Sequence, residues 1–385
     1  MRIGYDAKRA FQNNTGLGHY SRTLLQSLAT YYPENKYILF APKRTGKFDI
    51  KGNSAFEIIT PQHYPAKLFR SAWRSSWVKR DLVKQQIDLY HGLSHEIPLH
   101  IKRTGIPAVV TIHDLIFERF PEQHRAADRI IYRKKFRYAA THANRVIAIS
   151  EQTKKDLVEL YHIPADKIDV CYQSCDASYS QACTPGELAR VKETYRLPDR
   201  FFLSVGSIIE RKNLLTICKS LELLRPESAI PLVVIGNGNA YQQKVKDFLK
   251  EANMENQVIF LSEQPYAKEA AGFANSADFP AIYQQALAMI YPSLYEGFGL
   301  PVLEALCSGL PVITSNSSCL PETGGDAALY VDPMDAQALA EAMFSVANQP
   351  ALREEMIRKG YEHAKQFTPE NCAASVMNVY KSIIP

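Results

Sequence analysis

The 385-residue sequence has no long apolar run. No stretch approaches the roughly 20 consecutive apolar residues that a membrane-spanning helix needs. The opening residues Met1–Asp6 are typical of a strand, and no apolar segment precedes a small-residue cleavage site. We therefore expect neither a membrane-spanning nor an exported protein, but a cytoplasmic one.

Cysteine is scarce and shows no pairing pattern. The 7 cysteines are scattered between Cys171 and Cys372 and include no C-x-x-C pair. Cys171 and Cys175 are close in sequence, but no second Cys or His pair completes a zinc site. We expect reduced, mostly buried thiols.

Neither sign of charge dominates. The formal net charge is +5, which is modest for this length. We therefore expect no nucleic-acid partner. Hydrophobic residues make up 46% and charged residues 22%, which are the proportions of an ordinary globular protein. At about 150 residues per domain, the length predicts two or three domains.

Short β-branched runs alternate with helix-length segments along most of the chain. This alternation is typical of βα units and parallel sheets, so the fold class is predicted to be α/β. The strands expected in the first half are Arg2–Ala7, Tyr37–Ala41, Phe56–Thr60, Asp88–His91, Ala108–His113, Arg145–Ile149 and Ile168–Tyr172. Those expected in the second half are Phe201–Gly206, Pro231–Gly236, Val258–Leu261, Ala288–Tyr291, Pro311–Ser315 and Ala328–Val331.

The two series of strands are separated by the polar stretch Ser178–Arg200. We expect two doubly wound, Rossmann-like domains, spanning residues 1–180 and 181–366, that face each other across a cleft. A final helix within 367–385 is expected to cross back to the first domain. Ligands of such sheets bind outside the carboxyl ends of the strands, which would place the site in the cleft.

A pair of glutamates marks the chemistry of the second half. Glu296 follows an expected strand, and Gly297 and Gly299 leave the backbone bare where a helix should begin at about Leu300. A glycine turn at a helix N-terminus is suited to an anion. Glu304 falls one turn into that helix, and carboxylates suit sugar and ribose hydroxyls because each accepts several hydrogen bonds. A functional pair is favoured over two coincidental surface glutamates.

The context of these glutamates resembles a known family signature. The run Ser293–Ala305, SLYEGFGLPVLEA, is similar to the motif of the retaining GT-B glycosyltransferases of family four, also called glycosyl transferases group 1. Pro321–Pro333 extends the resemblance, which covers the chain nearly end to end and is strongest to bacterial mannosyltransferase-like members. It implies the GT-B fold, with a nucleotide-sugar donor bound by the second domain and the acceptor by the first.

The resemblance assigns roles to further residues. Arg211 and Lys212, soon after Gly206 at a strand end, would hold the donor diphosphate, although Ser207 stands where many relatives carry an additional Arg. His113, at the end of another strand, would contact the donor sugar; a structural histidine is the alternative. The expected catalytic residues are Glu296, His113, Arg211 and Lys212. The expected donor-binding residues are Gly16, Gly18, Gly206, Phe298, Gly299, Leu300 and Glu304.

The basic segment Lys67–Lys84 interleaves Lys and Arg with large apolar side chains, including Trp73 and Trp77. One interpretation is a basic surface for an anionic membrane, at the inner face of the plasma membrane, where a lipid-linked acceptor would be met. The other is an ordinary helix whose tryptophans pack inward. A second basic cluster spans Arg129–Arg137.

The predicted function is transfer of a hexose, mannose by resemblance, from a nucleotide-diphosphate sugar to a glycan or lipid-linked saccharide, as in cell-surface polysaccharide synthesis. GDP-sugars are favoured over UDP-sugars, and the nucleotide sugar is a substrate, so no cofactor and no catalytic metal are expected. On this view Glu296 orients the donor sugar and Glu304 the ribose. The alternatives are a GT-B-fold sugar-nucleotide epimerase, a sugar phosphorylase, or a non-catalytic nucleotide-sugar-binding protein.

Overall fold

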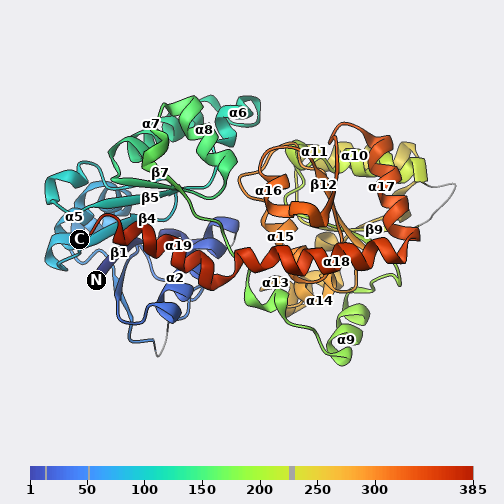
Figure 1. Cartoon of the computed structure of the whole chain (residues 1–385), viewed down its shortest axis with the longest axis horizontal. Helices are drawn as coiled ribbons and strands as arrows, with labels where there is room; N and C mark the ends of the chain where they lie inside the picture. The colour runs from blue at the N-terminus through green and yellow to red at the C-terminus, as the bar shows by residue number, and fades with distance from the viewer. Residues whose placement is uncertain (14, 51–52, 225–229, 385) are drawn as a thin grey trace. The chain divides into compact units, whose positions relative to one another are not determined.

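The computed structural model describes residues 1–13, 15–50, 53–224 and 230–384 (Figure 1). The chain divides into two compact units. Unit 1 comprises Met1–Ser174 together with Phe367–Pro385, and unit 2 comprises Cys175–Gln366. The sequence-based boundary after residue 180 differs slightly from this division, and the segment after Gln366 is part of unit 1.

Unit 1 is built on a parallel sheet with the order β3-β2-β1-β4-β5-β6-β7 in the described residues. Its strands are β1 Arg2–Asp6, β2 Lys36–Phe40, β3 Phe56–Ile59, β4 Leu89–Gly92, β5 Ala108–Ile112, β6 Arg145–Ala148 and β7 Ile168–Val170. Each expected strand of the first half is present.

Helices cover both faces of this sheet, so its strands are apolar on both sides. Along β2, Tyr37 and Leu39 join the core on one face, and Ile38 and Phe40 join the core on the other. The long helix α19 lies beside α2 and completes the first of these cores (Figure 1). The α-helices of unit 1 are α1 Lys8–Gln12, α2 Gly16–Tyr31, α3 Tyr64–Leu68, α4 Arg70–Ala72, α5 Val78–Lys84, α6 Ile116–Arg119, α7 Ala126–His142, α8 Glu151–Tyr161 and α19 Pro369–Lys381.

Unit 2 repeats the architecture with the strand order β10-β9-β8-β11-β12-β13 among its described residues. Its strands are β8 Phe202–Val205, β9 Leu232–Ile235, β10 Val258–Phe260, β11 Ala288–Tyr291, β12 Val312–Ser315 and β13 Ala328–Val331. Its α-helices are α9 Pro185–Tyr195, α10 Leu214–Leu224, α11 Ala240–Glu251, α12 Pro265–Glu269, α13 Ala271–Ala274, α14 Phe279–Tyr283, α15 Leu300–Cys307, α16 Leu320–Gly324, α17 Ala336–Asn348 and α18 Pro350–Ala364.

Both sheets have the doubly wound order in which the first and fourth strands of the series are neighbours. In unit 1 these strands are β1 and β4, and in unit 2 they are β8 and β11. The strand order reverses there, and the loops leaving the two carboxyl ends diverge, which opens a crevice for ligands. Each unit therefore has its own switch point, and the loops after these four strands are the places to search for chemistry.

The segment Lys67–Lys84 does not form one continuous helix. A π-helical turn, Trp73–Trp77, separates α4 from α5. Trp73 is 2% exposed and donates its indole N–H to Asp81 Oδ2 at 2.7 Å, whereas Trp77 is 40% exposed. The extra residue of a π turn rotates the helix faces, so the two tryptophans do not share one buried face.

All seven cysteines are free, and only Cys183 is not buried, which confirms the expected reduced, mostly buried thiols. Among the residues that the structure describes, no helix is long and apolar enough to cross a membrane.

Candidate functional site

The switch point of unit 2 brings Glu296 together with Arg211 and Lys212. Glu296 follows β11, and the two cations lie in a short 3-10 turn, Glu210–Lys212, after β8. Glu296 Oε1 accepts from Arg211 Nη1 at 2.8 Å and from Lys212 Nζ at 2.6 Å. The Tyr291 hydroxyl donates to the same oxygen at 3.3 Å. Three predicted site residues thus form one buried ionic cluster.

The loops that carry this cluster are tied to each other. The Leu294 amide donates to the carbonyl of Arg211 at 2.8 Å. Asn213, in the left-handed region with φ of 62°, donates its side-chain amide to the carbonyls of Pro292 at 3.2 Å and Pro333 at 2.6 Å. Because both loops are fixed by these bonds, the cations are held at the strand ends.

Charge is retained in the cluster despite its burial. Burial works to raise the pKa of Glu296, but the charges of Lys212 and Arg211 outweigh it and hold that pKa below its usual range. Burial lowers the pKa of Lys212, and the Glu296 carboxylate opposes that effect. A carboxylate bound by two cations leaves positive charge in excess, which is what a diphosphate requires.

Glycines bring two backbone segments of unit 2 into close approach. Gly206 has φ of +140°, and a Cβ on Gly236 would lie 1.8 Å from the Gly206 carbonyl oxygen. A Cβ on Gly238 would likewise lie 2.1 Å from the carbonyl oxygen of Ile208. The segment from Gly236 to Gly238 therefore packs against the loop that carries Arg211 and Lys212 and supports it.

Helix α15 begins at Leu300, as expected. Gly299 is its N-cap, with φ of 93° in the left-handed region that favours glycine. The side chain of Phe298 is buried, and the Thr323 hydroxyl donates to the Phe298 carbonyl. Phe298 therefore shapes the turn from within the core, and a donor contact by this residue would have to come from its backbone.

Glu304 lies in a different environment from Glu296. Its Oε2 accepts from the Tyr283 hydroxyl at 2.9 Å, and it shares no hydrogen-bond partner with Glu296 among the described residues. Burial raises the pKa of Glu304 to about 8, opposed by the Tyr283 hydrogen bond. Near neutral pH this carboxyl group is mostly protonated before any ligand binds.

The raised pKa of Glu304 predicts two effects of pH. Between the ordinary carboxyl pKa of 4.5 and about 8, the folded protein keeps a proton that the unfolded chain has lost, so this group lowers the free energy of unfolding as pH rises. If the ionised form accepts two ribose hydroxyls, nucleotide affinity should instead increase from pH 7 to 9. Calorimetric titration across that range checks this, with Glu304→Gln as the matched control; equal slopes for the two proteins would contradict it.

In unit 1, His113 lies directly after β5 and is buried. Its Nε2–H donates to the carbonyl of Leu93 at 2.9 Å, and its ring meets that of Tyr20 edge-on at 4.6 Å between centroids. Burial lowers the pKa of His113 to about 4, against the opposing Leu93 hydrogen bond. The ring is therefore neutral at physiological pH, and Nδ1 is the unprotonated nitrogen, able to accept from a hydroxyl.

His91 has a structural role instead. It lies in β4, where its Nδ1 is 2.6 Å from the Tyr380 hydroxyl and its Nε2 is 2.8 Å from Thr111 Oγ1. Both nitrogens are used within the core of unit 1. Ser150 is likewise structural: it is the N-cap of α8 and accepts from the Thr153 amide at 3.0 Å.

The two predicted glycines of the first loop differ in their surroundings. A Cβ on Gly18 would lie 2.1 Å from the carbonyl oxygen of Asn13, whereas a Cβ on Gly16 would meet no described atom within 4 Å. The fold therefore requires glycine at 18. At 16 the internal packing of the described residues does not require it.

This difference predicts unequal effects of alanine. Gly18→Ala should lower the free energy of unfolding by about 1–3 kcal/mol, because the Asn13 backbone must move to admit the methyl group. Gly16→Ala should unfold at the same urea concentration as the wild type. Equal destabilisation of both variants would mean that Gly16 is also a packing residue.

Two family models match this chain. Residues 15–179 match the model described as Glycosyltransferase Family 4, and residues 187–363 match the one described as Glycosyl transferases group 1. The chain belongs to this glycosyltransferase family. It is therefore a glycosyltransferase with two parallel-sheet, Rossmann-like domains, as the GT-B resemblance implied.

Individual relatives agree with this assignment. O-antigen chain mannosyltransferase B of Escherichia coli is 29% identical over 384 residues, covering 95% of this chain and 96% of the relative. A glycosyltransferase from Rickettsia africae superposes with a TM-score of 0.74 at 18% identity, covering 99% and 98% of the two chains. Anabaena HepE in complex with UDP-glucose does so with a TM-score of 0.74 at 16% identity, covering 99% and 100%.

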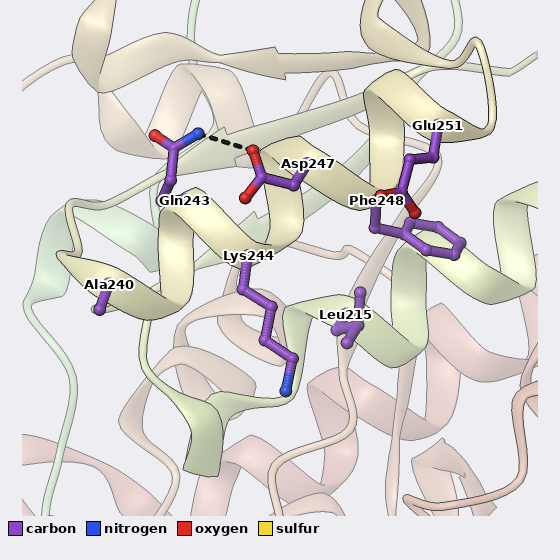
Figure 2. Close-up of a pocket in the computed structure, with 7 residues that line it drawn as sticks. All are labelled: Leu215, Ala240, Gln243, Lys244, Asp247, Phe248 and Glu251. Carbon is purple, nitrogen blue, oxygen red and sulfur yellow. Dashed lines mark hydrogen bonds between the residues drawn. The ribbon is translucent and has the colours of Figure 1, made fainter.

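A surface hollow of 530 Å³ in unit 2 lies between α10 and α11 of the glycosyltransferase (Figure 2). Leu215 of α10 and Phe248 of α11 are among the residues that line it, and Gln243 donates to Asp247 at 2.8 Å. No residue predicted from the sequence lines it. Sugar-nucleotide chemistry is instead expected at the strand ends, where the charged cluster lies.

Sequence reasoning missed the tyrosines of unit 2. The Tyr291 hydroxyl accepts from Lys212 Nζ and donates to Glu296, and Tyr283 bonds Glu304. Tyr291 ends a buried strand, and Tyr283 lies in a short helix, so both match ordinary core positions. The one available signal was the place of Tyr291 at a carboxyl strand end.

Proposed function

We propose that this glycosyltransferase is a retaining, metal-independent hexosyltransferase that moves mannose from a GDP-sugar to a glycan or lipid-linked saccharide. The observation that carries the proposal is the buried cluster of Arg211, Lys212 and Glu296 at the switch point of unit 2. It combines two cations for a diphosphate with a carboxylate for sugar hydroxyls.

The reaction would break the bond between the anomeric carbon and the diphosphate oxygen and form a bond from that carbon to the acceptor oxygen. Retention follows if both events occur on one face, with the acceptor proton passing to the departing diphosphate oxygen. Arg211 and Lys212 then stabilise the negative charge that grows on the leaving group. The N-terminus of α15 adds a positive dipole end after Gly299.

The remaining groups would position the donor. Glu296 accepts hydrogen bonds from hydroxyls of the transferred sugar, and neutral His113 accepts another through Nδ1. Glu304 binds the ribose. The mannosyltransferase relative supports mannose and, with it, a GDP donor; the UDP-glucose complex of HepE makes UDP-glucose the main alternative.

The test is release of nucleotide from a panel of GDP-, UDP- and ADP-sugars, with and without saccharide acceptor extracts. We expect GDP-mannose to be consumed fastest, chelator to leave the rate unchanged, and the anomeric configuration of the product, read by NMR, to match the donor. Consumption of UDP-sugars alone would change the donor assignment. No nucleotide release from any donor would favour a non-catalytic binding protein, and conversion of the donor sugar without transfer would favour an epimerase.

We also propose that the Lys67–Lys84 segment contacts an anionic membrane, where a lipid-linked acceptor is met. Apolar side chains are exposed around its start: Tyr64 by 78%, Leu68 by 63% and Phe69 by 57%. Lys67 and Arg70 are also exposed beside them. Exposed apolar groups among cations are typical of surfaces that bind the interface of an anionic bilayer.

Sedimentation with liposomes tests this contact. We expect more protein to sediment with anionic than with neutral vesicles, and Leu68→Ser with Phe69→Ser to remove the difference. A double variant on an exposed face of unit 2, Leu223→Ser with Phe344→Ser, serves as the control. Equal sedimentation with both kinds of vesicle would contradict the proposal.

A further inference from the structure

The switch point of unit 1 holds a charge cluster that the proposed function does not use. Asp6 ends β1, and Glu96 follows β4, the neighbouring strand. Arg74 joins them: its Nε donates to Asp6 Oδ2 at 2.8 Å and its Nη1 to Glu96 Oε2 at 2.9 Å. Lys135 Nζ also lies 3.3 Å from Glu96. Both carboxylates are therefore already bound by cations.

Two more cations follow β1 directly. Lys8 and Arg9 begin α1, and neither forms an ion pair with any residue in the described ranges. Arg9 Nε is buried and has no hydrogen-bond partner among the described residues. A buried guanidinium nitrogen without a protein acceptor is costly, and water, an ion or a ligand can supply the missing acceptor.

Lys8 and Arg9 are adjacent at the start of α1, after the carboxyl end of β1, and their charges act on neighbouring groups. Burial lowers the pKa of Lys8, and the charges of Arg74 and Arg9 lower it further. Burial also lowers the pKa of His95 and of His113, with the Arg9 charge contributing to both. The imidazoles are thus neutral, and positive charge is in excess at the carboxyl end of the sheet, where ligands of this fold bind.

We propose that Lys8 and Arg9 form a subsite for a phosphate group carried by the acceptor saccharide. A phosphate offers several oxygens, enough for a guanidinium fork and an ammonium at once. Arg74 is held by its bonds to Asp6 and Glu96, so it supports the subsite without itself binding the phosphate. The inference rests on the proposed function, which assigns the donor diphosphate to Arg211 and Lys212 of unit 2 and so leaves this cluster for the other substrate.

Calorimetric titration of the full chain with inorganic pyrophosphate, in saturating GDP so that the donor site is filled, tests the subsite. We expect wild-type protein to bind pyrophosphate and Arg9→Gln to bind it roughly tenfold more weakly. Arg103→Gln, an exposed arginine of the same unit, is the matched control and should bind as the wild type does. Lys8→Gln is the second variant if Arg9→Gln melts below the wild type.

A second arm identifies the source of the phosphate. Mannose 1-phosphate should displace pyrophosphate, and methyl α-mannoside should not. GDP affinity, measured separately, should be the same in Arg9→Gln and wild type. The subsite would be overturned if Arg9→Gln and Lys8→Gln bound pyrophosphate as tightly as the wild type. It would also be overturned if the wild type bound no pyrophosphate in saturating GDP. Weaker GDP binding in Arg9→Gln would assign these cations to the donor site instead. Failure of GDP to bind any variant would count against the proposed function instead, because pyrophosphate binding is read independently.

Discussion

Glu296→Gln is expected to lower kcat by at least about a hundredfold, the cost of losing a charged transition-state contact. The same variant should bind a nucleoside diphosphate at least as tightly as the wild type. In the structure the Glu296 carboxylate is bound by both Arg211 and Lys212. Glutamine cannot neutralise them, so the two cations become more available to a diphosphate while the sugar loses its acceptor.

The matched control is Glu304→Ala in the same unit. Glu304 is proposed to bind ribose, so its loss should weaken nucleotide affinity itself and reduce kcat less. Steady-state kinetics with a titration of nucleoside diphosphate separates the two variants. If Glu296→Gln lost nucleotide affinity and Glu304→Ala kept it, the two roles would have to be exchanged.

Arg74→Ala is expected to have the largest effect on stability. Asp6 is 2% exposed, and Arg74 supplies two of its hydrogen bonds. Removing one partner of a buried pair leaves an uncompensated charge and costs about 3–5 kcal/mol of unfolding free energy. Urea denaturation followed by a probe in unit 1 measures this loss.

Two further variants show whether the lost stability comes from leaving the buried Asp6 carboxylate without a cation. Arg74→Met combined with Asp6→Asn should recover part of the stability, because no buried charge is left unpaired. Arg358→Ala, which breaks a solvent-exposed pair with Glu355 in unit 2, should leave the free energy of unfolding almost unchanged. Similar losses in Arg74→Ala and Arg358→Ala would mean that Asp6 is better hydrated than its burial indicates.

Most of the fold could be predicted because strand signals here are local. Runs such as Pro231–Gly236 are apolar, β-branched and ended by glycine, which leaves little ambiguity for a buried parallel strand. The structure of the segment Phe69–Gln86 was harder to predict. Its composition favours one helix, but the π-helical turn at Trp73–Trp77 depends on the burial of Trp73 beside Asp81, a tertiary contact.

The site could be predicted only in part, for a similar reason. Arg211, Lys212 and Glu296 stand near strand ends, so their meeting follows from the sheet order. The hydrogen bonds that hold Arg74 to Asp6 join residues far apart in sequence, and Arg74 looked like one more cation of the basic segment. The close contact of Gly236 with Gly206 is likewise visible only in three dimensions.

The division of the chain has a consequence for synthesis on the ribosome. Unit 2 is one continuous stretch, Cys175–Gln366, whereas unit 1 is interrupted by it and completed by Phe367–Pro385. Tyr380, which bonds His91, is translated long after the strand that it stabilises. Unit 2 can therefore finish folding before unit 1, although its sequence is translated later. Until α19 has been translated, the part of the unit 1 core that α19 covers stays exposed. Slowing elongation near the 3′ end should lengthen that exposure, which makes unit 1 the part most dependent on chaperones during translation.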